Sequence, residues 1–201
     1  MKFVPKLFLA ILLVFLLSSS CADNKVRTNY KSAFQKKMNA MFKDASQTPL
    51  KAKDLKTFSS LSFFPVDSNF VVKAKLTPTP NSEYFDMKTT TERVSKERVF
   101  GVLSFELLQQ SIELEVYQGQ DSTEVKSNYL FLPFLDDTNG VSTYGGGRYM
   151  DLEIPITDSI WLDFNTAYNP YCAYNERYSC PVVPRQNYIP LQVKAGVKRF
   201  K

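Results

Sequence analysis

The residues best suited to chemistry lie in segment 143–152, which reads TYGGGRYMDL and places three successive glycines directly before Arg148. Exposed backbone N–H groups beside a guanidinium can form a concave nest for an anion, and so a binding site. The same glycines can instead mark a bend or the close approach of another backbone in a strand. Their spacing matches neither common phosphate loop, G-x-G-x-x-G or G-x-x-x-x-G-K. Both interpretations stay open, and the candidate ligand contacts here are Tyr144, Gly145, Gly146, Gly147, Arg148 and Asp151.

A run of oxygen-bearing side chains, DDTNG, begins at Asp136. A calcium loop of the EF-hand type needs such side chains at alternate positions and a glutamate six residues after its glycine. Here the side chains are consecutive, and the residue six positions after Gly140 is Gly146. The run therefore predicts no metal site but a tight turn, with Asn139–Gly140 as a two-residue hairpin turn. Asp136 is kept as a candidate ligand contact.

The segment IWLDFN, residues 160–165, alternates as a strand does and puts Trp161, Asp163 and Asn165 on one face. A carboxylate and an amide on one face suit an open polar pocket. Asp163 can equally accept hydrogen bonds from the backbone of the loop that follows. Asp163 and Asn165 are candidate ligand contacts on the first interpretation.

The loop at residues 165–180 reads NTAYNPYCAYNERYSC and contains four tyrosines and three asparagines. Tyrosine offers rigid amphipathic contact area and asparagine offers adaptable hydrogen bonds, a combination that binding loops use. Packing on a β core would need the same residue types. Asn169 and Tyr174 are the candidate ligand contacts of this loop. Cys172 and Cys180 are expected to form a disulfide in an oxidising compartment, the alternative being two buried thiols.

The chain contains no histidine. This absence excludes Ser-His-Asp and Cys-His catalysis and any zinc site with histidine ligands. No catalytic residue, metal or cofactor is therefore assigned. Any catalysis would have to rest on carboxylates, lysine, tyrosine or an oxygen-bound cation.

An amphipathic helix is predicted over residues 29–44. Within it Tyr30, Phe34, Met38 and Phe42 recur every four residues, with lysines on the opposite side. This stripe would either pack on the core of the domain or lie on a membrane surface.

Downstream of the helix the hydrophobic pattern changes to a period of two. In SIELEVYQ, residues 111–118, Ile112, Leu114 and Val116 would face inward and Tyr117 outward. The segments RVFGVLSFEL, YLFLPF, IWLDFN and PLQVKAG are further strand candidates, with short turns between them. One helix followed by about eight strands predicts a mainly β (α+β) fold, an antiparallel sandwich or partly closed barrel with one N-terminal helix.

The chain opens MKFVPKLFLAILLVFLLSSSC, which has the basic, apolar and small-residue segments of a secretory signal. The apolar run 7–17 is shorter than the roughly 20 residues of a membrane-spanning helix. Its end at Cys21 resembles a bacterial lipoprotein signal. We expect residues 1–20 to be the signal peptide, 21–28 a short tether and 29–201 a single β-rich domain.

A lipid attached to Cys21 would anchor the protein in the membrane. Ala22, in place of an aspartate, predicts a location on the periplasmic face of the outer membrane rather than the inner membrane. The formal net charge of +5 is mild, so neither charge nor export suggests nucleic acid as a partner.

Long motifs in the C-terminal third resemble the bacterial family DUF1684, a domain of unknown function: LFLPFLDDTNGVSTYGGGRYMDL, LDFNTAYNPYCAYNERYSCPVVP and VKAGVK. SFFPVDSNFVVKAKL and TTTERVSKERVFGVLSFEL are similar to its shorter, lipoprotein-type members. The likeness covers about residues 30–201. It departs in the valines of CPVVPRQN and in the closing VKRFK. The resemblance implies no known activity.

Two classes of function follow from these residues. The first is a non-catalytic lipoprotein of the cell envelope that binds a small polar, anionic or glycan-like ligand, or a partner protein. The second is a carboxylate- or metal-dependent hydrolase, with Asp136 or Asp137 and Asp163 as acid and base.

Overall fold

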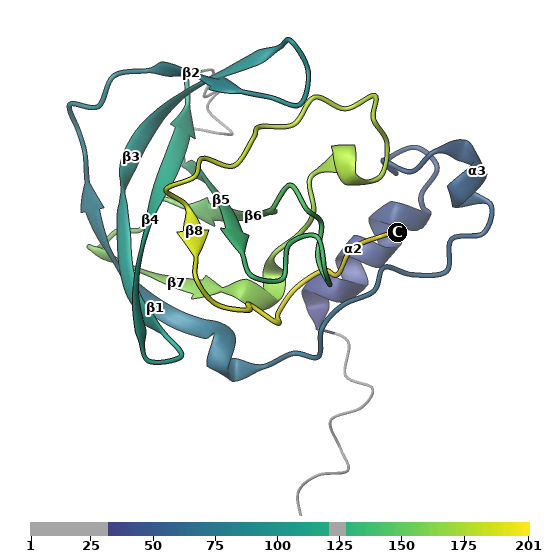
Figure 1. Ribbon diagram of the computed structural model, residues 1–201, viewed down its shortest axis with the longest axis horizontal. Helices are drawn as coiled ribbons and strands as arrows, with labels where there is room; N and C mark the ends of the chain where they lie inside the picture. The colour runs from purple at the N-terminus through teal and green to yellow at the C-terminus, as the bar shows by residue number, and fades with distance from the viewer. Residues whose placement is uncertain (1–31, 121–127) are drawn as a thin grey trace, which may run out of the picture. The chain divides into compact units, whose positions relative to one another are not determined.

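The computed structural model describes residues 32–120 and 128–201, in which an antiparallel sheet curls into a half-barrel (Figure 1). Its strands are β1 (Val71–Pro78), β2 (Phe85–Lys88), β3 (Val94–Leu107), β4 (Gln110–Gly119), β5 (Tyr129–Asp136), β6 (Arg148–Glu153), β7 (Ser159–Asp163) and β8 (Tyr188–Ile189). They lie in the order β6-β5-β4-β3-β1-β7, while β2 pairs with β3, and β8 pairs in parallel with β5. The predicted fold class is confirmed, with the partly closed sheet as its form.

The main hydrophobic core lies on one face of this sheet. Ile112, Leu114 and Val116 are buried there, which confirms the alternation predicted for β4. Each aliphatic side chain of this size contributes about 1.5–3 kcal/mol when it is fully buried. The same core contains Leu76, Leu103, Phe105, Leu107, Leu130, Leu132, Phe134, Met150, Leu162 and Phe164. This face therefore supplies most of the apolar burial that holds the strands together.

The opposite face of the sheet carries a second cluster. Tyr117, Phe131 and Tyr149 each follow or precede a residue of the main core, so they point to the other side. Met87 and Val183 pack against them. The prediction that Tyr117 faces solvent is wrong: its side chain is 0% exposed, because segments outside the neighbouring strands cover this face.

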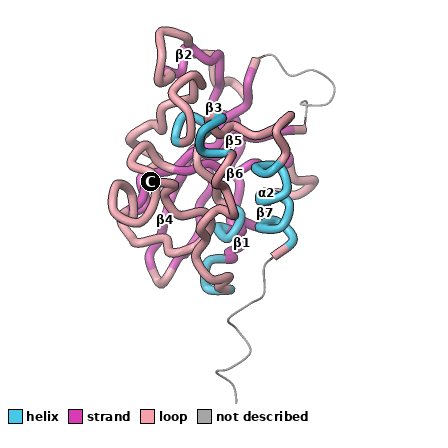
Figure 2. Tube along the Cα trace, turned by 90° about the vertical axis from the view of Figure 1, so that its right-hand side faces the viewer, coloured by secondary structure: helices cyan, strands magenta, loops and turns pink. Residues whose placement is uncertain are grey.

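The N-terminal helix, α2 (Ala33–Lys43), lies along one side of the described molecule (Figure 2). Its N-cap is Ser32, whose hydroxyl accepts a hydrogen bond from the backbone N–H of Gln35 at 3.2 Å. Phe42 is fully buried and meets the ring of Tyr174 edge-on at 4.7 Å between centroids. In the described part of the helix, the apolar stripe thus packs on the domain; residues 29–31 lie outside the described residues.

The remaining short elements are α3 (Ala52–Leu55) and the 3-10 turns η1 (Ser68–Phe70), η3 (Phe164–Thr166) and η4 (Tyr171–Ala173). Among the described residues, no helix is long and apolar enough to cross a membrane. The predicted signal peptide, the tether and Cys21 all fall within residues 1–31, outside the part that the structure describes.

The segment PLQVKAG, residues 190–196, is not a strand, contrary to the prediction. Val193 and Ala195 are buried in the main core as the alternation suggested. Their carbonyl groups, however, accept hydrogen bonds from the side chain of Arg148 instead of from a neighbouring strand. The side chain of Arg148 supplies the hydrogen bonds that a neighbouring strand would supply in a sheet.

The predicted two-residue hairpin turn at Asn139–Gly140 is also wrong. β5 ends at Asp136 and β6 begins at Arg148, so the connection runs over residues 137–147. Within it, the carbonyl of Thr138 accepts from several following backbone N–H groups, which closes a compact local turn. Asn139 is held inside that turn because its side chain contacts the backbone N–H of Asp136 at 2.7 Å.

Replacing Gly147 with alanine is expected to lower the free energy of unfolding by about 1–3 kcal/mol. Gly147 has φ +90, and an added Cβ would stand 2.7 Å from the carbonyl oxygen of Phe134 and from a methyl group of Val183. Gly145→Ala is the matched control, since its nearest neighbour is 3.8 Å away. Urea unfolding of both variants measures the difference. Equal losses would show that the close approach at Gly147 does not fix this bend.

Candidate functional site

Arg148 and Asp136 form an ion pair inside the main core. Both side chains are 0% exposed, and Nη2 of Arg148 lies 3.1 Å from Oδ1 of Asp136. The guanidinium also donates to the carbonyls of Val193, at 2.8 Å, and Ala195, and lies over the ring of Phe134. Burial lowers the pKa of Arg148, an effect that the charge of Asp136 opposes. This arrangement favours the structural interpretation of the glycine–arginine segment.

The three glycines do not form a hollow with Arg148. Gly145 and Gly146 are exposed, whereas Gly147 is buried against β5. The ring of Tyr144 lies against Gly146, and its hydroxyl is 3.8 Å from the sulfur of Cys172. The guanidinium faces the core, and so the predicted anion nest does not assemble from these groups.

Asp163 and Asn165 form hydrogen bonds with the backbone at the end of β7. Asp163 accepts from the backbone N–H of Asn165 at 3.0 Å and from its side-chain amide at 2.8 Å, which caps η3. The amide of Asn165 also exchanges hydrogen bonds with the backbone of Asp67. Of the two interpretations of IWLDFN, the structure favours a carboxylate that satisfies backbone donors.

Asn169 and Tyr174 are buried under the C-terminal segment. The amide of Asn169 donates to the carbonyl of Lys198 at 3.0 Å and to the hydroxyl of Tyr174 at 3.3 Å. Tyr174 is 4% exposed, so neither side chain presents a surface to a ligand.

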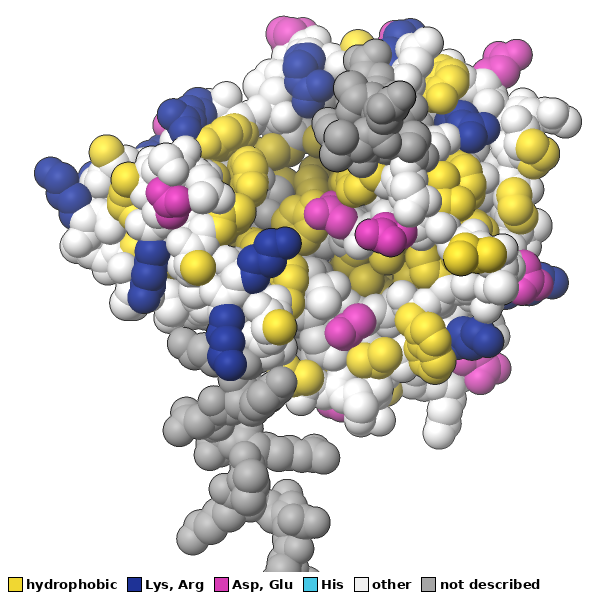
Figure 3. Space-filling view, turned by 180° about the vertical axis from the view of Figure 1, so that it is seen from behind, with side chains coloured by type: hydrophobic (Ala, Val, Ile, Leu, Met, Phe, Trp, Pro, Cys, Tyr) yellow, Lys and Arg dark blue, Asp and Glu magenta, His cyan; other side chains and the backbone are white. Residues whose placement is uncertain are grey.

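A cavity of about 1010 Å³ lies on the face of the sheet opposite the main core. In the space-filling view it is a hollow with a largely hydrophobic floor and both basic and acidic side chains around it (Figure 3). α2 contributes Phe34, Lys37, Met38 and Met41, and the start of β3 with the residue before it contributes the stretch 93–97. The other walls come from β5, β6 and the tyrosine-rich loop, through Tyr129, Phe131, Tyr149, Asp151, Tyr168, Tyr171, Tyr178, Ser179, Cys180 and Pro181.

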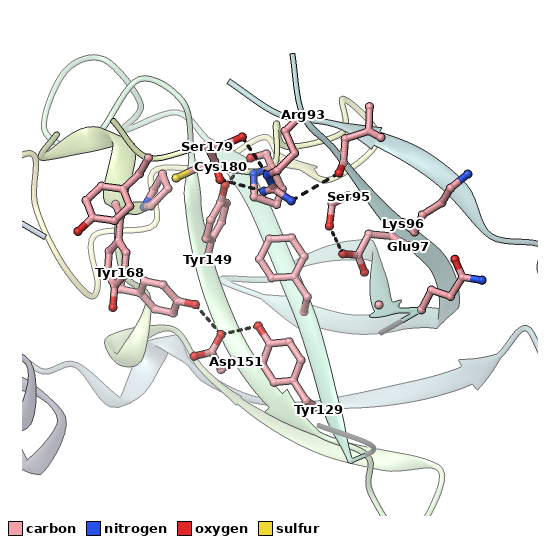
Figure 4. A pocket seen from close by; sticks show the side chains of 18 of the residues that line it. Arg93, Ser95, Lys96, Glu97, Tyr129, Tyr149, Asp151, Tyr168, Ser179 and Cys180 are labelled. Carbon is pink, nitrogen blue, oxygen red and sulfur yellow. Dashed lines mark hydrogen bonds between the residues drawn. The ribbon is translucent and has the colours of Figure 1, made fainter. Parts of the chain in front are cut away.

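Asp151 stands in this cavity between two tyrosine hydroxyls (Figure 4). Tyr129 donates a hydrogen bond to its Oδ1 at 2.9 Å, and Tyr168 donates to the same oxygen. Burial, followed by the charge of Asp151, raises the pKa of both tyrosines, so they remain donors. No residue that the structure describes donates to Oδ2. Among the described residues, Oδ2 therefore has no donor, and it can accept a hydrogen bond from a ligand.

Glu97 supplies a second carboxyl group to the same cavity, from β3 (Figure 4). It is buried, and its Oε1 accepts a hydrogen bond from the hydroxyl of Ser95 at 2.7 Å. Burial raises the pKa of Glu97, against the lowering effects of Ser95 and Arg93. Glu97 therefore holds its proton to a higher pH than an exposed glutamate does, and it can donate a hydrogen bond when protonated.

Two basic side chains near the cavity already have partners. Arg93 donates from Nε and Nη2 to the hydroxyl and carbonyl of Ser179, at 3.1 and 2.9 Å. Lys96 pairs with Asp86 at 2.6 Å. Lys37 of α2 also lines the cavity, so Asp151, which accepts hydrogen bonds from hydroxyl or amine groups, is the feature that favours such groups over anions.

Only Asp151 among the sequence-predicted ligand contacts lines this cavity, although three tyrosines of the predicted binding loop line it as well. The sequence reasoning missed the contributions of α2, Glu97, Tyr129 and Tyr149. A signal was present in β6, where Tyr149 and Asp151 alternate with Arg148 and Met150 and so share a face. Nothing in the sequence indicated which strands would lie beside β6.

The predicted disulfide between Cys172 and Cys180 is not present in the structure, where both are free thiols. The two residues are nevertheless adjacent, since the backbone N–H of Cys172 lies 3.2 Å from the sulfur of Cys180. Across residues 32–120 and 128–201, no group of three or more acidic or cysteine side chains is placed to hold a metal ion.

Comparisons with known proteins give a family and a fold. The family model described as "Protein of unknown function (DUF1684)" matches residues 56–198. A solution NMR structure of an uncharacterized protein from Haloarcula marismortui is 34% identical, with a TM-score of 0.66, over 83% of this chain and 90% of that chain. No curated protein matches the chain. The match spans well over half of the sequence, and the chain therefore belongs to the DUF1684 family.

Proposed function

We propose that this protein is a non-catalytic binding domain for a small glycan-like ligand, which the cavity around Asp151 would hold. The observation that carries this proposal is the open Oδ2 of Asp151 beside two tyrosine hydroxyls in a cavity with aromatic walls. Sugars combine apolar ring faces, which stack on aromatic side chains, with hydroxyl groups that donate to carboxylates. The volume of about 1010 Å³ lies at the upper end of ordinary ligand pockets and gives room for several sugar units.

The charge in the cavity favours neutral or amine-bearing sugars. A ligand carboxylate near Asp151 would be repelled by the like charge of that side chain. An amine would instead gain a charge-assisted hydrogen bond to Oδ2 of Asp151. The sequence left polar, anionic and glycan-like ligands open. Among these, the proposal selects ligands that donate hydrogen bonds.

Four trisaccharides test this proposal: the β-1,4-linked trimers of glucosamine, N-acetylglucosamine and glucose, and the trimer of galacturonate as the anionic comparator. Isothermal titration calorimetry with the purified protein gives the dissociation constants. We expect the glucosamine trimer to bind at least tenfold more tightly than the galacturonate trimer. The proposal fails if none of the four binds, or if the galacturonate trimer binds most tightly.

A hydrolase remains the second candidate, on a different pair of carboxyl groups from the one first considered. Asp136 is held by Arg148 and Asp163 caps η3, whereas Glu97 and Asp151 both line the cavity. A buried Glu97 with a raised pKa and a second carboxyl group, Asp151, in the same cavity are a pair of the kind that acid–base hydrolysis uses. New reducing ends appearing during the titration would favour this candidate over plain binding.

We further propose that a lipid on Cys21 tethers the domain to the periplasmic face of the outer membrane. The support is the signal-like segment of residues 1–20 and the alanine after the cysteine. No role in nucleic-acid binding is proposed.

A further inference from the structure

Cys172 and Cys180 come together at the two ends of one loop. Cys172 lies in η4, and the sulfur of Cys180 accepts from its backbone N–H at 3.2 Å. On the other side, the backbone N–H of Cys180 donates to the hydroxyl of Thr90 at 3.1 Å. The hydroxyl of Tyr144 is 3.8 Å from the sulfur of Cys172. The two cysteines thus lie next to each other, with groups from two other segments of the chain around them.

The two thiols differ in environment. Cys172 is partly exposed and lines a small hollow of about 200 Å³ beside Lys51 and Lys53. Cys180 is 6% exposed and forms part of the wall of the large cavity. A hydrogen bond from Cys180, assisted by Tyr144, lowers the pKa of Cys172 to about 6, whereas the pKa of Cys180 is raised. Cys172 is the accessible thiolate of the pair, and Cys180 is the sheltered thiol.

We propose that Cys172 and Cys180 form a redox-active pair that exchanges with the disulfides of small thiols or of other proteins. Cys172 attacks one sulfur of a disulfide RS–SR, forms a mixed disulfide with it and expels one RS⁻. Cys180 loses its proton and attacks the sulfur of Cys172, which forms the Cys172–Cys180 bond and expels the second RS⁻. The two cysteines are oxidised, the external disulfide is reduced, and the two protons are carried by the two RSH products.

Cys180 borders the cavity proposed for a glycan-like ligand, but thiol exchange does not involve Asp151, so either proposal can fail without the other. The redox-active pair also differs from a permanent structural disulfide, which resists reduction by the glutathione pool. The asymmetry of exposure and the thiolate character of one partner are the features that exchange requires.

The test uses the full chain with Cys21→Ser, so that only the two paired thiols react, and oxidised glutathione as the probe. We expect the mass of this protein to fall by about 2 Da, with no lasting glutathione adduct, as the two-step exchange requires. Cys180→Ser should accumulate one glutathione on Cys172, and Cys172→Ser should react at least tenfold more slowly. Mass spectrometry of quenched samples gives both the products and the rates.

Two results would overturn the proposal. If Cys172→Ser and Cys180→Ser react with oxidised glutathione at equal rates, Cys172 is not the attacking thiol and Cys180 is not the resolving one. If the Cys172–Cys180 disulfide is not reduced at any ratio of reduced to oxidised glutathione, it is a structural disulfide. A midpoint of the equilibrium within the range of those mixtures would support exchange. Circular dichroism of each variant shows whether the domain remains folded.

Discussion

Replacing Arg148 with methionine is expected to lower the free energy of unfolding by about 3–5 kcal/mol, because it leaves Asp136 as a buried carboxylate without its cation. The pair is completely buried, and the guanidinium also serves the carbonyls of Val193 and Ala195. Urea unfolding followed by circular dichroism measures the change. The loss should lower the urea concentration at the midpoint of unfolding and leave the dependence of the free energy on urea unchanged.

Two further variants show whether burial of the charge is the cause. Lys96→Met breaks the exposed pair with Asp86, and such a pair is worth about 0–1 kcal/mol. The double variant Arg148→Met with Asp136→Leu should recover part of the loss, since it removes both charges. Recovery stays incomplete because the carbonyls of Val193 and Ala195 have lost their donor, and the donors of Thr138 and Val193 have lost Asp136 as their acceptor. If Lys96→Met costs as much as Arg148→Met, the explanation by burial is wrong.

Asp151→Ala should weaken binding of the glucosamine trimer by about 10–100-fold, the effect of one lost charge-assisted hydrogen bond of about 1.5–3 kcal/mol. Asp151 itself is exposed, but its loss leaves the hydroxyls of Tyr129 and Tyr168 without their acceptor, so a moderate fall in the free energy of unfolding is expected as well. Calorimetric titration of the variant with this trimer gives the ratio of dissociation constants.

Two substitutions separate charge, hydrogen bonding and position. Asp151→Asn keeps an acceptor but removes the charge, and should weaken the glucosamine trimer more than the glucose trimer. Asp163→Ala removes a carboxylate that caps η3 outside the cavity, and should leave binding unchanged while it lowers stability. Loss of binding in Asp163→Ala but not in Asp151→Ala would place the ligand at IWLDFN, another segment that the sequence suggested.

Much of the fold could be predicted because the alternation of apolar and polar residues within a segment indicates which side chains of a strand are buried. Ile112, Leu114 and Val116 needed no knowledge of distant segments to be assigned to the core. Tyr117 and the segment 190–196 failed for the opposite reason. The covering of Tyr117 and the hydrogen bonds of 190–196 depend on residues far away in the sequence, Phe85 and Arg148 respectively.

The candidate site was less predictable, because it exists only after the strands have paired. The register of β5 and β6 places Phe131 opposite Asp151, and Glu97 joins them from β3. Arg148 was a candidate ligand contact because the three glycines before it could form an anion nest, one of two interpretations of that segment. Its partner Asp136 was itself among the candidate contacts, but a sequence gives no means of telling an internal ion pair from two separate surface charges.

The hydrogen bonds of Arg148 also impose an order on the protein's assembly. During synthesis, β5 and β6 leave the ribosome with Asp136 and Arg148 before residues 193–195 have been made. Until those residues arrive, the carbonyls that the guanidinium serves do not exist, and its full set of partners cannot form. The interior of the half-barrel is therefore completed only once the segment after β8 has been translated, which makes this late segment the final piece of the core rather than an appendage to it.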